Sequence, residues 1–502
     1  MARIHARMLA TGAAAALLLG TVALPPATAG PGHGHGGPGH GNEGHGNGGH
    51  GNGKGPGGGH GAGHGHGPGK AAELGREVLA ADDGWAAANG GVTGGSAADA
   101  AHVSTVRTWD EFRAALGGGA ARGDTTPRIV YVEGTIDAFA GADGARLTCE
   151  DFGQQVAVGG DPAAPFSMDD YIAAYDPTVY GWIDPSGPLE DARVAAASVQ
   201  AAQTQQHVGS NVTIVGLGKD ARIVGANVRI RDSSNVILRN LTFSDAYDCF
   251  PQWDPADTDQ GNWNSAYDNV SVWTSTNVWV ANSTFDDGDH PAQSLPTVFG
   301  RPYEVHDGLL DITHSSNYVT VSYNRFSGHD KTMLIGSSNN RPADEGTLKV
   351  TIHHNRWEGI GQRAPRVRYG QVHVYDNLYV VGSDNDLYQY VWGPGTRSQL
   401  YLEDNVLRLA RGIDLASVLT NWGATQLTEK GTLVNGRPAS VLDAFHAAGG
   451  DPFTEPAGWE PPHVADKDPV RSVERIVEAE AGAGRIASKA PAAPKPTPPG
   501  RR

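Results

Sequence analysis

The fold is decided by a repeated pattern whose two clearest copies are Val372-His-Val-Tyr-Asp-Asn377-Leu-Tyr379 and Leu400-Tyr-Leu-Glu-Asp-Asn405-Val-Leu407. Each copy is a β-prone run that leads to an Asn and then to a bulky residue. Four earlier segments follow the same pattern, with the marked residue at Asn240, Asn282, Asn324 and Asn355. Such repetition is typical of a solenoid, in which each coil supplies a strand and stacking buries the alternate apolar residues.

The marked Asn residues lie 22 to 42 residues apart, which fits a short coil with insertions of variable length. A β-propeller fits less well, because its blades need a steadier repeat of about 40–45 residues. An Asn at a turn can bond neighbouring backbone and stack on the Asn of the next coil. We therefore expect an all-β fold built as a parallel β-helix.

The segment before the repeats is mixed. Thr108-Trp109-Asp110-Glu111 has the form of a capping box, so we expect a helix that begins there and is closed by Gly117. The Ala/Gln-rich stretch 189–206 predicts a second helix, and the β-branched run 128–132 predicts a strand.

The chain has 502 residues and a net charge of −17, which argues against a nucleic-acid partner. Near the N-terminus, Arg3 and Arg7 precede an apolar run over residues 9–24, and Ala27-Thr28-Ala29 fits a cleavage site. This pattern indicates a secretory signal over residues 1–29 rather than a membrane span. We therefore expect a secreted, extracellular protein without a membrane partner.

Composition divides the remainder. Residues 30–70 are almost only Gly, His, Pro and Asn and predict a disordered tether; its irregularly spaced His residues favour a solvated segment over a transition-metal site. We expect the β-helix domain over 71–465 and an Ala/Pro-rich tail over 466–502. Cys149 and Cys249 are the only cysteines, so in an exported chain they are expected to form a disulfide.

Three aspartates could meet on successive coils: Asp268, Asp307 and Asp311. Their hard oxygen ligands would select calcium rather than zinc. The alternative is that they are ordinary turn residues at strand ends. A second acidic group, residues 286–289, could instead hydrolyse a glycosidic bond as a carboxylate pair, although Gly288 favours an acidic loop.

Basic residues follow the acidic ones. Lys331 alone could be a solvated charge, but Arg363, Arg366 and Arg368 fall within six residues and open a predicted strand. Such a cluster suits an anionic ligand with planar carboxylates, the alternative being a surface network of ion pairs with the acids. No phosphate-binding loop, Cys-His pair or Gly-x-Ser-x-Gly nucleophile motif appears in the sequence.

From about Leu74 to about Pro461 the sequence resembles the pectate lyases of polysaccharide lyase family 1. The resemblance is densest in segments 84–95, 245–254, 261–264, 353–356 and 362–375, of which the last reads Gln-Arg-Ala-Pro-Arg-Val-Arg-Tyr-Gly-Gln-Val-His-Val-Tyr. It implies a right-handed, single-stranded parallel β-helix with a few short helices and long loops. It also implies calcium-dependent cleavage of polygalacturonate by β-elimination, which leaves 4,5-unsaturated oligogalacturonates.

The resemblance also implies roles for individual residues. The positions of the calcium ligands fall on Asp268, Asp307 and Asp311, those of the substrate-binding residues on Lys331 and Arg368, and that of the catalytic base on Arg363. Asp257 falls where some members of the family bind an additional calcium. Because Arg is normally protonated, alkaline pH is expected to favour proton abstraction by Arg363.

Three alternatives to this function remain open. They are a pectin lyase acting on methyl-esterified substrate without calcium, a β-helical hydrolase, and a non-catalytic β-helical polysaccharide-binding protein. The three Asp and Lys331 favour the charged substrate, and the combination with Arg363 favours an enzyme. A monomer is expected.

Overall fold

The computed structural model describes residues 74–464 and 467–486. The predicted secretory signal, the Gly/His-rich tether and residues 487–502 of the predicted tail lie outside the described residues. The proposed division of the chain therefore stays a prediction. No described helix is long and apolar enough to cross a membrane.

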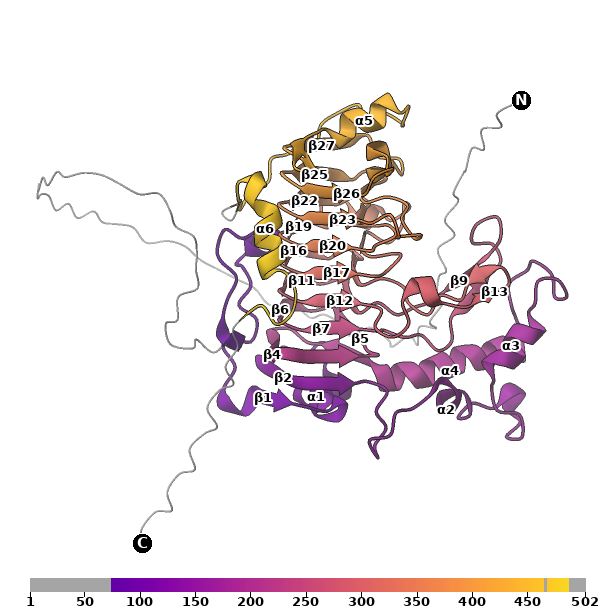
Figure 1. Cartoon of the computed structure of the whole chain (residues 1–502). Coiled ribbons are helices and arrows are strands. Elements are labelled where there is room, and N and C mark those ends of the chain that lie inside the picture. The colour runs from indigo at the N-terminus through magenta and orange to yellow at the C-terminus, as the bar shows by residue number, and fades with distance from the viewer. Residues whose placement is uncertain (1–73, 465–466, 487–502) are drawn as a thin grey trace, which may run out of the picture. The chain divides into compact units, whose positions relative to one another are not determined.

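Strands stack in parallel in three series, which form the faces of the coils (Figure 1). The first series is β3 (Gln205–Val208), β5 (Asn227–Arg231), β10 (Val270–Trp273), β15 (Leu310–Thr313), β18 (Leu334–Ile335), β21 (Arg366–Val367) and β24 (Gly393–Pro394). The second is β1 (Val103–Val106), β2 (Arg128–Asp137), β4 (Val212–Val224), β6 (Ser234–Arg239), β11 (Thr276–Ala281), β16 (Asn317–Ser322), β19 (Val350–His353), β22 (Gln371–Tyr375), β25 (Gln399–Glu403) and β27 (Gln426–Lys430). The third is β7 (Thr242–Ser244), β12 (Thr284–Asp286), β17 (Arg325–Ser327), β20 (Arg356–Glu358), β23 (Leu378–Val381), β26 (Val406–Leu409) and β28 (Leu433–Val434).

The core lies inside the coils, where apolar side chains of the same register stack. One row of the second series consists of fully buried residues: Val280, Val321, Ile352, Val374 and Leu402. Burying one such side chain stabilises by about 1.5–3 kcal/mol. The predicted all-β parallel β-helix, with a few short helices and long loops, is confirmed.

Each repeated sequence run forms two strands rather than one. The run around Asn377, for example, supplies β22 and then β23, with Asn377 at the bend between them. The repeat therefore marks a corner of the coil, where the chain passes from the second series to the third. This corner corrects the expectation of one strand in each repeat.

The predicted Asn ladder is confirmed for four coils. The Nδ2 group of each Asn donates to the Oδ1 atom of the Asn in the next coil, at 3.0, 3.0 and 3.1 Å through the series Asn324, Asn355, Asn377 and Asn405. All four side chains are fully buried. The ladder therefore satisfies polar groups at a corner that has no access to water.

For Asn240 and Asn282 the prediction is wrong by one residue. Phe243, Phe285 and Phe326 are in register, so the ladder position falls on Leu241 and Ser283 in the first two coils. Ser283 occupies it, because its N–H donates to Asn324 Oδ1 at 2.9 Å. Asn282 has a positive φ of 46° and instead donates to the Glu480 carbonyl at 3.3 Å.

An aromatic stack runs beside the ladder on the third series. Successive ring centroids lie 5.2, 5.0, 4.2 and 5.9 Å apart through Phe243, Phe285, Phe326, Trp357 and Tyr379. These are the bulky residues of the sequence repeat. They fix the register of neighbouring coils on the core side of the corner.

Helices cover the ends and one side of the stack. They are α1 (Trp109–Ala115), α2 (Cys149–Gly153), α3 (Met168–Ala174), α4 (Pro188–Thr204), α5 (Val441–Ala447) and α6 (Val470–Glu480). The expected helix over 189–206 corresponds to α4, and the strand over 128–132 to the start of β2.

The helix predicted after Thr108 is α1. Thr108 Oγ accepts from the Glu111 N–H at 3.2 Å, and Gly117 follows the helix with a left-handed φ of 97°. Glu111 Oε2, however, accepts from the N–H of Arg107 rather than of Thr108. The helix ends are as predicted, but the reciprocal half of the capping box is shifted by one residue.

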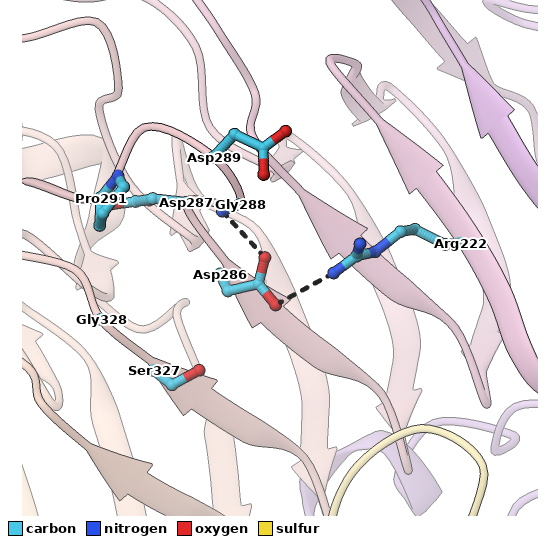
Figure 2. A pocket seen from close by; sticks show the side chains of 8 residues that line it. All are labelled: Arg222, Asp286, Asp287, Gly288, Asp289, Pro291, Ser327 and Gly328. Atoms are coloured by element: carbon cyan, nitrogen blue, oxygen red, sulfur yellow. Dashed lines mark hydrogen bonds and ion pairs between the residues drawn. The ribbon is translucent and has the colours of Figure 1, made fainter.

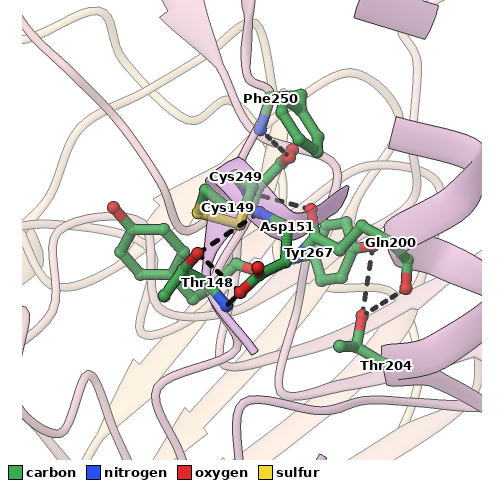
Figure 3. The surroundings of a disulfide bond; sticks show 10 residues. Thr148, Cys149, Asp151, Gln200, Thr204, Cys249, Phe250 and Tyr267 are labelled. Atoms are coloured by element: carbon green, nitrogen blue, oxygen red, sulfur yellow. Dashed lines mark hydrogen bonds between the residues drawn. A yellow bond between two sulfur atoms is a disulfide. The ribbon is translucent and has the colours of Figure 1, made fainter. Parts of the chain in front are cut away.

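A lateral lobe carries the disulfide between Cys149, the first residue of α2, and Cys249 (Figure 3). Their Cα atoms are 5.2 Å apart, so the predicted pairing is confirmed. Gln200 of α4 accepts from the N–H of Cys249 at 3.0 Å. The lobe also contains two antiparallel hairpins, formed by β8 (Gln252–Asp254) with β9 (Asn262–Asn264) and by β13 (Thr297–Val298) with β14 (Arg301–Pro302).

A buried polar network ties both ends of the described chain to the second series. His353 Nε2 lies 2.9 Å from Asp83 Oδ1 near the N-terminal end, and His354 Nε2 lies 3.1 Å from Asp468 Oδ2, just before α6. The Nδ1 atoms of the two imidazoles are 2.7 Å apart. We call His353, His354, Asp83 and Asp468 the back-face network. Beside it, α6 buries Val473 and Val477 against the stack.

Candidate active site

The three predicted aspartates meet at the first series of strands. Asp268 lies just before β10 and Asp307 just before β15, whereas Asp311 is the second residue of β15. Their ligand oxygens lie within 4.8 Å of one another. Stacking of successive coils therefore brings together residues 43 positions apart, as the sequence pattern predicts.

Local hydrogen bonds orient two of these carboxylates. Asp268 accepts from Ser271 Oγ at 2.5 Å and from the Gly308 N–H at 2.9 Å. Asp311 accepts from the Leu334 N–H of the next coil at 2.9 Å. These hydrogen bonds fix the orientation of the Asp268 and Asp311 carboxylates without any bound ligand.

Gly308 is required by the close approach of these groups. A Cβ atom at this position would lie 2.5 Å from Asp311 Oδ1 and 2.9 Å from Asp268 Oδ1. Any side chain would therefore push the two carboxylates apart or enter the space between them.

The electrostatics of the group favour a cation. Burial, together with the neighbouring Asp307, raises the pKa of Asp268 to about 7. Burial, together with Asp268 and Asp307, also raises the pKa of Asp311 well above its usual range. Three carboxylates in one partly buried space repel each other unless a positive charge compensates them. An oxygen-only donor set of this kind fits a hard divalent ion such as calcium.

Lys331 lies beside the aspartates, on the next coil. Its ammonium forms an ion pair with Glu304 and lies 3.8 Å from Asp307 Oδ1. Burial lowers the pKa of Lys331, but Glu304 and Asp307 outweigh burial and raise it. The side chain is therefore a fixed, charged ammonium at the edge of the acidic group.

Arg363 is held in an unusual backbone conformation beside Lys331. Its φ is +61°, and the cis Ala364–Pro365 peptide follows it. Its carbonyl accepts from the Met333 N–H at 2.7 Å, which ties it to the coil of Lys331. The Nε atom is buried and has no hydrogen-bond partner among the described residues.

The other two arginines of the motif are held by different contacts. The Arg366 guanidinium lies 4.2 Å from the centroid of the Trp422 ring. Arg368 donates from Nε to Asn339 at 2.8 Å and from Nη1 to the Gly336 carbonyl at 2.9 Å. Burial, with the nearby Arg366 and Arg363, lowers the pKa of Arg368 to about 10. The three guanidinium groups thus form one basic cluster.

The acidic loop over residues 286–289 forms a separate pocket with Arg222 and Ser327 (Figure 2). Asp286 accepts from the Gly288 N–H at 3.0 Å and faces Arg222 at 3.8 Å, whereas Asp289 is exposed. Asp287 is buried and faces His329 Nδ1 at 2.8 Å. Asp286 and Asp287 face different partners and Asp289 is exposed, which disfavours the carboxylate pair that a hydrolase needs.

Two supporting residues were missed by the sequence reasoning. His329 Nε2 lies 2.9 Å from the Asp307 carbonyl, and its other nitrogen faces Asp287. Asp287 therefore acts through His329 on the backbone of Asp307. The other missed residue is Glu304, the partner of Lys331. The only sequence signal for either was the position of His329 two residues before Lys331.

Asp257, which the resemblance associates with an additional calcium, lies in the loop between β8 and β9. Its backbone N–H donates to Asp254 Oδ1 at 3.2 Å, and its carboxylate is 3.5 Å from Asn262 Nδ2. It is not part of the group formed by the three site aspartates. Its role in metal binding stays a prediction.

Comparison with known proteins assigns the family. The sequence model of the family described as "Pectate lyase" matches residues 72–160 and 178–443. A pectate lyase of Bacillus subtilis (strain 168) is 41% identical over 419 residues, which cover 83% of this chain and 95% of that protein. Pectate lyase E of Dickeya chrysanthemi is 34% identical over 71% of this chain and 76% of its own length.

Solved structures agree with these relatives. The structure of a thermostable pectate lyase, PL 47, superposes with a TM-score of 0.78 at 40% identity and covers 82% of this chain and all of that one. A structure described as a pectate lyase bound to hexasaccharide gives a TM-score of 0.76 at 39% identity, with 83% of this chain and all of that one covered. The chain therefore belongs to the pectate lyase family and is a lyase that acts on pectate.

Proposed function

We propose that the chain cleaves polygalacturonate by calcium-dependent β-elimination at the site formed by the three aspartates and the basic cluster. The observation that carries this proposal is that the acidic and basic groups lie side by side. The ligand oxygens of the three aspartates are within 4.8 Å of one another, and Lys331 and Arg363 lie beside them on adjacent coils. Such a site binds a cation on one side and the carboxylates of an anionic polymer on the other. The hexasaccharide in a related structure supports a polymeric substrate.

Asp268, Asp307 and Asp311 would hold the calcium. Bound calcium would neutralise the uronate carboxylate, which acidifies the neighbouring C5–H bond. Lys331 and Arg368 would bind the same carboxylate and stabilise the charge that develops on it. Arg368 suits this role because Asn339 and the Gly336 carbonyl fix its guanidinium.

Arg363, in its neutral form, would remove the proton from C5. The electron pair of the broken C5–H bond forms the C4=C5 double bond, and the glycosidic oxygen leaves from C4 and takes a proton from solvent. The products are a new reducing end and a 4,5-unsaturated end. Support for Arg363 comes from its buried Nε atom, which has no hydrogen-bond partner among the described residues.

The alternative of a pectin lyase needs a site that binds neutral methyl esters. The three clustered aspartates and the charged Lys331 favour the charged substrate instead. The non-catalytic alternative is disfavoured by the family assignment, and the β-helical hydrolase by the different partners of Asp286 and Asp287.

An extracellular location is part of the proposal. It is supported by the apolar run after Arg3 and Arg7 and by the disulfide between Cys149 and Cys249, since disulfides persist in oxidising compartments. We also propose a monomer, because the stack buries a continuous core within one chain. Mass determination of the secreted protein in solution tests both expectations.

The central experiment compares products formed from polygalacturonate with calcium and with excess chelator. Elimination yields fragments whose new non-reducing end lacks one water relative to hydrolysis, which mass spectrometry resolves. We expect unsaturated fragments only when calcium is present. Saturated fragments would contradict elimination, and full activity in chelator would favour the pectin-lyase mechanism.

A further inference from the structure

Glu304 is the closest anionic partner of the proposed substrate-binding Lys331. The two side chains form an ion pair and are both largely buried, with exposed fractions of 15% and 12%. Among the described residues, Lys331 is the only group that bonds the Glu304 carboxylate. Both residues also line a small cavity with Leu295 and Pro302. The Glu304 carboxylate is thus already paired with the Lys331 ammonium, which is proposed to bind the carboxylate of the substrate.

The backbone on both sides of Glu304 is fixed. The Tyr303 N–H donates to the Pro296 carbonyl at 2.8 Å, and the Val305 carbonyl accepts from the Asp248 N–H at 2.8 Å. The His306 ring lies 3.0 Å from the Ala246 carbonyl. Tyr303 also packs on Trp263, with ring centroids 4.9 Å apart. Glu304 is therefore built into the wall of the site, on a backbone that is fixed beside Lys331.

This arrangement changes the charge that a substrate meets. If the calcium compensates Asp307, the remaining carboxylate near Lys331 is that of Glu304, and the pair is neutral overall. A neutral pair attracts a galacturonate carboxylate less than an isolated ammonium does, whereas a neutral methyl ester is affected little. The pair therefore reduces the preference of the site for the charged form over the ester.

We propose that Glu304 is a specificity-determining residue, which compensates the charge of Lys331 and so allows the site to use partly methyl-esterified pectin as well as polygalacturonate. This inference rests on the proposed function, in which Lys331 binds the uronate carboxylate. Glu304 takes no part in proton transfer or metal binding.

The test is the ratio of kcat/KM on polygalacturonate to kcat/KM on highly methyl-esterified pectin, measured at saturating calcium. Glu304→Gln keeps the shape of the side chain and an oxygen acceptor for Lys331 but removes the charge. We expect the ratio to rise about fivefold, mainly through a lower KM on polygalacturonate, which is the scale of one unit charge at a partly solvated site. An unchanged ratio would overturn the proposal.

Two further variants serve as controls. Glu304→Asp keeps the charge and should leave the ratio within about twofold of the wild-type value; it also supplies a charged comparison if the amide variant is unstable. Glu345→Gln makes the same chemical change at an exposed residue that pairs with Arg397 and should not alter the ratio. A fivefold rise in all three variants would mean that the ratio does not report on Glu304.

Two measurements separate this inference from the proposed function. If Lys331→Ala leaves KM on polygalacturonate unchanged, the proposed role of Lys331 is wrong. If Lys331→Ala weakens binding while Glu304→Gln leaves the ratio unchanged, only the inference about Glu304 is wrong. A Glu304→Gln variant whose sole change is a higher calcium requirement would identify Glu304 as a metal ligand and would also overturn the inference.

Discussion

The corner that carries the Asn ladder and the face that carries the active site belong to the same coils but are built differently. At the corner, buried Asn side chains repeat from coil to coil and bond one another at 3.0–3.1 Å. At the site, β18 and β21 have only two residues each, and long loops separate them. One region is uniform and fully satisfied, whereas the other is irregular and carries like charges close together.

The difference teaches where the stability of a solenoid resides. The ladder and the aromatic stack beside it add similar favourable contacts at each of the coils that they span. The acidic group has the opposite character, because burial and the neighbouring Asp307 raise the pKa of Asp268, and burial with both neighbouring carboxylates raises the pKa of Asp311. A regular corner can therefore support a charged site on the neighbouring face. Changes at the corner should mainly affect stability, and changes at the site should mainly affect activity.

The largest effect is expected at the site, for Arg363→Lys. This variant keeps a positive charge but changes reach and removes the guanidinium, so a base at this position would be lost. We expect kcat to fall by at least about 1,000-fold with little change in KM, since the lost interaction belongs to the transition state. Steady-state kinetics on polygalacturonate measure both constants.

Arg366→Lys is the matched control for that variant. It changes the same chemical group directly after the proline, on a side chain that packs on Trp422. It should retain most of the turnover. Near-normal kcat in a folded Arg363→Lys enzyme would remove Arg363 from the role of base but would leave the family assignment intact.

The next largest effect is expected at the corner, for Asn355→Ala. The fully buried Asn355 side chain accepts from the N–H and Nδ2 groups of Asn324 and donates to Asn377 and to two carbonyls. Leaving these groups unsatisfied should lower the free energy of unfolding by about 3 kcal/mol. Denaturant titration measures the loss, and kcat per folded molecule should stay unchanged.

Asn282→Gly tests the corrected register of the ladder. Asn282 lies one residue before the ladder position, and Gly accepts its positive φ of 46°. We expect a loss of less than about 1 kcal/mol. Equal destabilisation by both variants would mean that burial in the ladder does not distinguish the two Asn residues.

A smaller, pH-dependent effect is expected from the back-face network. Burial, with the nearby His353, lowers the pKa of His354 to about 4, whereas His in an unfolded chain has a pKa of about 6.5. Between these values the unfolded state binds more protons, so acidification favours unfolding. The free energy of unfolding should fall by about 1–2 kcal/mol between pH 7 and pH 5 from this residue.

The measurement is the unfolding midpoint across that pH range for the wild type and for His354→Gln. The amide can still donate to Asp468 but does not titrate, so the variant should show a shallower dependence on pH. Identical slopes for the two proteins would exclude His354 as a source of acid sensitivity.

The effect expected for Asp307→Asn is confined to calcium binding. Asp307 is the most exposed of the three site aspartates, with a side-chain exposure of 38%, and the amide keeps an oxygen ligand. We expect the calcium concentration for half-maximal activity to rise about tenfold, with turnover largely recovered at saturating calcium. Turnover that does not depend on calcium in either protein would contradict the assignment of the metal site.

The sequence predicted those parts of the site that depend on the coil itself. Asp268 and Asp311 come together because parallel coils place successive strand ends side by side. Lys331 and Arg363 follow on the next two coils for the same reason. The disulfide between Cys149 and Cys249 could be predicted without any structure, since the chain has no other cysteine.

The parts of the site that the sequence did not predict lie in the long insertions between strands. The path of an insertion does not follow the repeat, so its contacts cannot be inferred from the spacing of residues. Glu304 reaches Lys331 from the long segment between β12 and β15, and Asp287 reaches His329 from the start of that segment. The one-residue error at Asn282 has a related cause: an Asn that relieves a positive φ and an Asn that bonds the next coil look the same in sequence. Only the register of Phe285 with Phe326 separates them.

The hydrogen-bonded stacking of the first series has a consequence for length. Adjacent strands lie about 4.8 Å apart, so the three steps from β10 through β15 and β18 to β21 cover about 14 Å along the stack. This spacing is set by backbone geometry and is the same whatever side chains the coils carry. Charged groups on successive coils are therefore separated by multiples of one constant distance. A whole coil inserted between β15 and β18 would move the arginines about 4.8 Å further from the aspartates along the stack.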